Sequence, residues 1–202
     1  MNSPFSSLKV VLLLALVVGV GYFISMQVGN KNVDQSGAVA NAAGNGASVT
    51  FVSQNVQIGQ HAGSNNDVAV YTIKYRIKAP ADTPVYVAAS PSTGYVATSK
   101  FMFAIDKAGV PLTQAKYVSG GVYGVTTNMT DSDVTVGGNY MIDPGSYEIF
   151  EMTVVMTNNA QIGAGLFRAK LANIKWNTTD SASVYNNFAN LPGFATSYVA
   201  VD

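Results

Sequence analysis

Few residues in this chain could carry out chemistry, and an acidic loop is the first candidate. Asp131 and Asp133 place two carboxylates two positions apart, and Asn128 lies just before them. Carboxylate and amide oxygens are the ligands that Ca²⁺ prefers, but the glycine and glutamate of an EF-hand loop are missing. The sequence therefore offers Asn128, Asp131 and Asp133 as candidate calcium ligands. A polar hairpin tip without a metal is the alternative, and no other cofactor is predicted.

The residues needed for enzymatic catalysis are scarce. His61 is the single histidine and lies in a Gly/Asn-rich turn, and the chain has no cysteine. A Ser-His-Asp triad would have to use this histidine, while thiol nucleophiles, disulfides and Cys-zinc sites are excluded. Glu148 and Glu151 differ in parity, so a regular strand would point them to opposite faces. We predict no catalytic residue and no enzymatic activity.

Tyrosine is the remaining residue type with a chemical use. Exposed tyrosine rings can stack on sugar rings, but tyrosine is also an ordinary strand residue. The tyrosines spread along the chain are Tyr86, Tyr95, Tyr117, Tyr123, Tyr140, Tyr185 and Tyr198. They leave a carbohydrate-binding module open as one alternative function.

The elements that position these residues are short alternating segments, of which Asp67–Lys78 is the clearest. One face of this segment is apolar and carries Ala69, Tyr71, Ile73, Tyr75 and Ile77. The other face carries Lys74, Arg76 and Lys78, which we expect to be solvated. A period of two with one polar face indicates a half-buried strand in an antiparallel sheet.

Further strands are expected throughout the rest of the chain. They cover Ser48–Ile58, Val85–Ala89, Tyr95–Ile105, Thr113–Val118, Val122–Thr127, Val134–Met141, Tyr147–Thr157, Leu166–Trp176 and Thr196–Val201. Turns are expected at Asp106–Gly109 and Asp143–Gly145, and an irregular excursion over Thr178–Pro192. Roughly eight to ten strands with regular turn signals predict an all-β protein, an antiparallel β-sandwich.

A family resemblance arises in the second half of the chain. A Pro-Gly turn at Ile142–Gly145 precedes an alternating strand that closes on Thr157-Asn158-Asn159, and Leu166–Trp176 follows. This pattern resembles the immunoglobulin-like domains of bacterial surface proteins. The resemblance implies an Ig-like sandwich and a surface setting. It carries no functional residue across, because the Cys-Trp-Cys core of those domains is absent.

The N-terminal segment 1–26 contains a long apolar run, Leu8–Met26, whose single charge is Lys9. Its length as a helix approaches the ~30 Å of a bilayer core, and no cleavage site follows closely. We expect a single transmembrane helix that acts as an uncleaved signal-anchor. A cleaved signal peptide, which would leave a secreted protein, is the alternative.

The segment 27–47 is rich in Gly, Asn and Ala and predicts a flexible linker, with the β-domain occupying 48–202. The positive-inside rule then places residues 48–202 outside the cell membrane. Only 11% of residues are charged and the formal net charge is zero, which argues against a nucleic-acid partner.

These features together predict a non-enzymatic, membrane-anchored surface protein with a structural or adhesive role. Its partners would be the membrane, through residues 8–26, and either further copies of itself or a surface protein or glycan. A pilin-like filament subunit that assembles through the apolar helix is an alternative, although the glycine and glutamate of a type IV prepilin are missing.

Overall fold

The computed structural model describes residues 39–41, 46–60, 66–89, 103–113, 122–130, 133–181, 186–189, 191 and 193–202. These residues form antiparallel β-strands arranged in three sheets, and no helix occurs among them. The predicted all-β antiparallel class is confirmed. No helix within these ranges is long and apolar enough to cross a membrane, and the predicted anchor Leu8–Met26 lies outside them.

The largest sheet has five strands and is built around three long ones. Its order is β1 (Val39–Asn41), β2 (Ser48–Gln60), β3 (Asp67–Lys78), β9 (Tyr147–Thr157) and β7 (Tyr123–Asn128). The bounds predicted for β3 and β9 agree with the structure. The pairing of β1 with β2 departs from the prediction, because residues 39–41 fall inside the expected linker.

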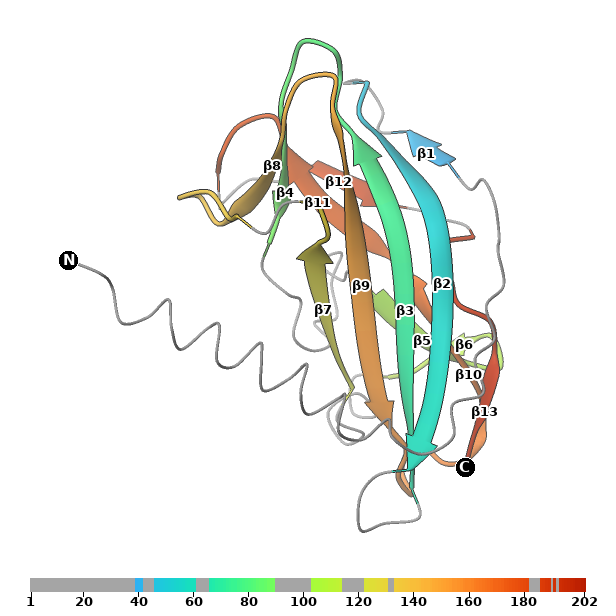
Figure 1. Cartoon of the computed structure of the whole chain (residues 1–202). Helices are drawn as coiled ribbons and strands as arrows, with labels where there is room; N and C mark the ends of the chain where they lie inside the picture. The colour runs from blue at the N-terminus through green and yellow to red at the C-terminus, as the bar shows by residue number, and fades with distance from the viewer. Residues whose placement is uncertain are drawn as a thin grey trace, which may run out of the picture.

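Two four-stranded sheets complete the domain and lie behind the long strands in Figure 1. One has the order β13 (Val199–Val201), β10 (Gly165–Leu171), β5 (Phe103–Lys107) and β6 (Val110–Pro111). The other has the order β12 (Asn186–Ala189), β11 (Asn173–Asn177), β4 (Val85–Ala88) and β8 (Asn139–Ile142).

All three sheets contribute side chains to a single hydrophobic core. Tyr75 of β3 stacks on Phe150 of β9, with ring centroids 5.6 Å apart, and Phe150 meets the edge of Tyr140 from β8 at 5.8 Å. Between β7 and β5, a Cβ placed on Gly124 would lie only 2.7 Å from Cδ1 of Phe103. The five-stranded sheet therefore packs against strands of both smaller sheets.

An irregularity in β2 changes which of its residues face this core. Phe51 pairs with Tyr75 and Ser53 pairs with Lys74, so Val52 is the extra residue of a β-bulge. A bulge shifts the in-and-out alternation by one position. As a result Gln54 points inward and is buried.

Gln54 is satisfied by the segment that leads into β13. Its Nε2 donates to Oγ of Ser197 at 3.0 Å. Its Oε1 accepts from the Ser197 backbone N–H at 3.0 Å. The bulge therefore ties β2 to the C-terminal segment, because a buried amide must find partners.

Three expectations about local structure were wrong. Leu166–Trp176 is not one strand: it breaks at Ala172, and its halves, β10 and β11, belong to different sheets. The range Thr178–Pro192 is not wholly irregular, because it contains β12. The first half of Val134–Met141 is a turn, and only its end joins β8. The break at Ala172 follows from pairing with strands far away in sequence, since β10 pairs with β5 and β11 with β4. The turn before β8 is held by Asp180. Local periodicity reveals neither of these contacts.

The turn at Asp143–Gly145 is confirmed. The Ser146 N–H donates to the Asp143 carbonyl at 3.0 Å, and Gly145 has a φ of 75°. Such a φ at this position favours glycine. The expected turn at Asp106–Gly109 is shorter than predicted, since β5 continues through Lys107 and only Ala108 and Gly109 turn the chain.

Candidate functional site

The outer face of the sheet β13-β10-β5-β6 brings together charged and aromatic side chains from three segments. Phe167, Ala169 and Leu171 of β10 point into the core, so Arg168 and Lys170 project from the opposite face. Arg168 pairs directly with Asp106 of β5. Extending the pairing of Phe167 with Val199 by one position places Tyr198 on the other side of Arg168. We call Asp106, Arg168, Lys170 and Tyr198 the Arg168 site.

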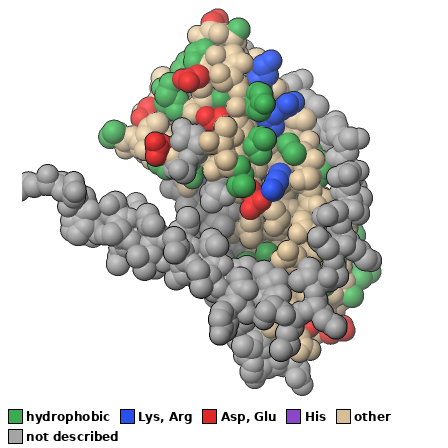
Figure 2. Space-filling model, viewed as in Figure 1, with side chains coloured by type: hydrophobic (Ala, Val, Ile, Leu, Met, Phe, Trp, Pro, Cys, Tyr) green, Lys and Arg blue, Asp and Glu red, His purple; other side chains and the backbone are tan. Residues whose placement is uncertain are grey.

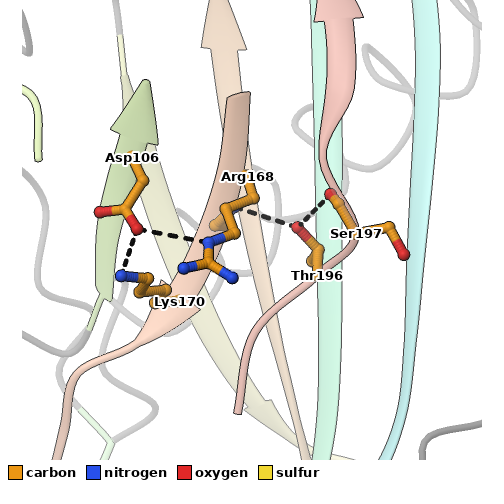
Figure 3. Close-up of polar contacts among 6 residues, drawn as sticks. Asp106, Arg168, Lys170, Thr196 and Ser197 are labelled. Carbon is orange, nitrogen blue, oxygen red and sulfur yellow. Dashed lines mark hydrogen bonds and ion pairs between the residues drawn. The ribbon is translucent and has the colours of Figure 1, made fainter. Parts of the chain in front are cut away.

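Asp106 is the buried centre of this site, with 0% of its surface exposed. Its Oδ2 accepts from Nε of Arg168 at 3.3 Å and forms an ion pair with Nζ of Lys170. Figure 3 shows both cations converging on this one carboxylate. A buried charge requires partners of opposite sign, and here two cations share one anion. The cluster therefore carries a formal charge of +1.

Arg168 is held from two directions. Its guanidinium carbon lies 4.5 Å from the centroid of the Tyr198 ring, a cation–π contact, while its Nε is fixed by Asp106. Within the described part of the chain no partner is seen for its two Nη groups, and 29% of the side chain is exposed. Asp106 and Tyr198 therefore hold the guanidinium in place, while the side chain as a whole stays partly exposed.

Apolar side chains border the Arg168 site. Leu166 lies two positions before Arg168 on the same face of β10 and is 52% exposed. Pro111 of β6, which pairs with Asp106, is also exposed. The Ala108–Gly109 turn lies beside Tyr198, because a Cβ on Gly109 would be 3.9 Å from the Tyr198 Oη. Tyr198 itself is 37% exposed.

The segment before β13 fixes the position of Tyr198. The Thr196 N–H donates to the Ala169 carbonyl at 2.9 Å, and the Ala169 N–H donates to the Thr196 side-chain oxygen at 3.0 Å. The hydroxyl of Thr196 in turn donates to the Ser197 carbonyl at 3.1 Å, as Figure 3 shows. Because Ser197 is also bound to Gln54, the chain entering Tyr198 has little freedom to move.

The predicted calcium ligands are only partly described. Asn128 ends β7 and is buried; its Oδ1 accepts from the Thr130 N–H at 2.9 Å, and its Nδ2 donates to Glu148. Asp133 is exposed, and Asp131 lies outside the described residues. The described residues contain no group of three or more His, Cys, Asp or Glu side chains that could hold a metal ion. The calcium loop stays a prediction.

A different acidic residue, Asp180, organises the neighbouring turn. It accepts hydrogen bonds from the Thr135 hydroxyl at 2.7 Å, the Gly137 N–H at 3.1 Å and the Asn139 amide at 2.8 Å. Gly137 is needed for this approach, since a Cβ there would lie 2.6 Å from the Asp180 Cγ. The hydrogen bonds, from Asn139 first and Thr135 second, hold the pKa of Asp180 below its usual value. This carboxylate acts as a structural clamp on the turn.

The expected solvated face of β3 is confirmed. Arg76 and Lys78 are exposed, Lys74 is bound to Glu151 at 3.3 Å, and Arg76 lies 5.2 Å from the Tyr147 ring centroid. Figure 2 shows Lys and Arg side chains along this face, beside hydrophobic ones. Arg76 and Tyr147 form a second arginine–tyrosine pair, and no acidic residue stands opposite Arg76 in the sheet.

The described tyrosines do not share one environment. Among those with described side chains, Tyr140 is buried, Tyr86 is half-buried and Tyr198 is exposed. Burial raises the pKa of the Tyr140 phenol, partly opposed by a backbone hydrogen bond from Asn128. His61, Tyr95, Tyr117 and Tyr185 lie outside the described residues, as does the Tyr123 side chain.

Sequence reasoning missed Asp106, Arg168 and Lys170 as a group. It predicts a turn at Asp106, because Asp and Gly commonly form turns. A signal for a strand was present: Phe103 and Ile105 alternate with Ala104 and Asp106, so Asp106 continues the strand pattern. The pairing of β5 with β10, which are far apart in sequence, then creates the site.

Comparisons with protein-family models, with curated proteins and with solved structures find no match to this chain.

Proposed function

We propose that this chain is a non-enzymatic surface protein: a membrane anchor at Leu8–Met26, a linker, and an extracytoplasmic Ig-like β-sandwich with a structural or adhesive role. The single observation that carries the proposal is a long apolar segment followed by an all-β domain with one shared core. Antiparallel sheets packed across a common core are the arrangement that a sandwich requires.

Support for an adhesive role comes from the Arg168 site. Its charged and aromatic groups lie on the sheet face opposite the core. Two ion pairs to Asp106 hold Arg168 and Lys170, and the bond between Ala169 and Thr196 fixes the segment that carries Tyr198. Binding residues on a rigid scaffold favour recognition, because little ordering entropy is lost on contact.

Cysteine accessibility tests the topology directly, since the natural chain has no cysteine. Val136 is fully exposed at the tip of the turn held by Asp180, so Val136→Cys provides a reporter on the domain. Ser6→Cys provides a matched reporter before the apolar run. In intact cells a membrane-impermeant maleimide should label position 136 and leave position 6 unlabelled until the cells are permeabilised.

Labelling of position 136 only after permeabilisation would contradict an extracytoplasmic domain. Release of the chain by alkaline carbonate would point to the cleaved, secreted form. Electron microscopy of the intact chain in mild detergent addresses the remaining alternative, because ordered fibres would favour a filament subunit whose apolar segments pack together.

A further inference from the structure

We propose that the Arg168 site binds a carboxylated saccharide, such as a uronic acid unit of a polysaccharide. This inference rests on the proposed function, because it names the ligand class of a surface protein with an adhesive role. The juxtaposition that carries it is an arginine held by a buried aspartate and a tyrosine ring, next to a lysine and to exposed apolar side chains.

The charge of the site selects a singly charged group. Asp106 neutralises one of the two cations, which leaves a formal charge of +1 from Arg168 and Lys170. The matching ligand therefore offers the site a single negative charge, as one carboxylate of a uronic acid unit does. A densely sulfated or phosphorylated polymer would bring several charges to a site that can neutralise only one.

The geometry of the site selects a planar anion. Arg168 uses its Nε on Asp106, and none of the described residues binds its two Nη groups, which we assign to the ligand. Paired guanidinium N–H groups match the two oxygens of a carboxylate. Because Asp106 and Tyr198 already fix this side chain, less rotamer entropy is lost when the ligand binds. Lys170 is 35% exposed and adds a second cation near the same position.

The surroundings of the site suit a sugar ring. Tyr198, Leu166 and Pro111 present aromatic and aliphatic surface on the same sheet face as the cations. The C–H groups of a pyranose can rest on such surface while its carboxylate meets Arg168. An acidic peptide is the competing occupant, and its extended backbone would not place C–H groups on the Tyr198 ring as a pyranose does.

The experiment measures binding of trigalacturonate to the full chain in mild detergent, by titration calorimetry at low and high salt. Its methyl ester is the uncharged control, and dextran sulfate and a tri-glutamate peptide are the competing anions. We expect trigalacturonate to bind, the methyl ester to bind at least about 10-fold more weakly, and affinity to fall as salt rises.

The variants distinguish a loss of specific contacts with the ligand from a loss of charge and from a loss of folding. Arg168→Ala and Tyr198→Ala should each weaken binding roughly 10-fold or more. Arg168→Lys keeps a cation beside Asp106 but removes the fork, so it should also weaken binding. Arg76→Ala is the matched control, because it removes the other arginine–tyrosine pair, and it should leave affinity unchanged. Fluorescence of the single, buried Trp176 confirms that each variant folds.

Several outcomes would overturn the proposal. The methyl ester could bind as tightly as trigalacturonate, or both Arg168 variants could keep the natural affinity. Arg76→Ala could lose as much affinity as Arg168→Ala. Dextran sulfate or the tri-glutamate peptide could bind while trigalacturonate does not. The cysteine-labelling experiment is independent of these results. Failure to bind the saccharide with position 136 labelled in intact cells would reject the ligand and leave the proposed function standing.

Discussion

Gly124→Ala tests whether the five-stranded sheet packs face to face against the sheet that contains β5. In the structure Gly124 of β7 lies over the ring of Phe103, and both residues are buried. A Cβ at position 124 would be 2.7 Å from Cδ1 of Phe103, whereas carbon atoms in contact lie about 3.5–4.0 Å apart. The ring would have to move by about 1 Å within a filled core.

The expected size of the effect follows from two opposing terms. Overpacking a core costs about 1–3 kcal/mol, while replacing a strand glycine by alanine recovers about 0.5–1 kcal/mol of backbone entropy. We therefore expect a net loss of up to about 2.5 kcal/mol in the free energy of unfolding, centred near about 1 kcal/mol. The central value corresponds to a fall in Tm of about 2–4 °C for a domain of this size.

Urea unfolding of the full chain, followed by fluorescence of Trp176, measures this loss. A double-mutant cycle with Phe103→Leu isolates the contact, because the smaller side chain leaves room for the new methyl group. In the Phe103→Leu background, Gly124→Ala should cost less than about 0.5 kcal/mol.

Gly138→Ala is the matched control for this cycle. Gly138 has a φ of 78°, and a Cβ added there would meet no atom within 4 Å, so alanine at this position is strained without a clash. Its cost should be the same in both Phe103 backgrounds. If Gly124→Ala is neutral in the natural chain and shows no coupling to Phe103, the packing of β7 on β5 described above is wrong.

Three further predictions concern polar groups. Hydrogen bonds lower the pKa of Asp180, so the stability they add is present above the unfolded pKa of about 3.9 and is lost as pH falls through the lower pKa of the folded state. NMR of the Asn139 side-chain amide should detect this loss at low pH. In Asp180→Asn the pH-dependent change in that signal should be absent. Gln54→Ala should cost about 1–3 kcal/mol by chemical denaturation, since the Ser197 N–H loses its acceptor; an unchanged midpoint would contradict it. The Tyr71 hydroxyl is buried without a partner in the described part of the chain, so Tyr71→Phe should leave stability unchanged or raise it by up to about 1 kcal/mol, and a clear loss of stability would refute this.

Local pattern by itself determined two long strands of the five-stranded sheet, β3 and β9. The alternation in Asp67–Lys78 and Tyr147–Thr157 predicts their bounds and buried faces, because side-chain direction in a strand repeats every two residues. The turn at Asp143–Gly145 was equally predictable, since proline and glycine fix its dihedral angles. The apolar run Leu8–Met26 is likewise recognised from composition and length alone.

Tertiary structure alone decided which strands pair and which polar residues meet. The pattern of Leu166–Trp176 is continuous, yet its halves join different sheets, because each pairs with a strand far away in sequence. Asp106 was predicted to lie in a turn and is instead buried under two cations from β10. A carboxylate becomes a site only when the fold brings its counter-charges to it. The pairing of β5 with the distant β10 sets that meeting, and the alternation within each strand does not specify its partner.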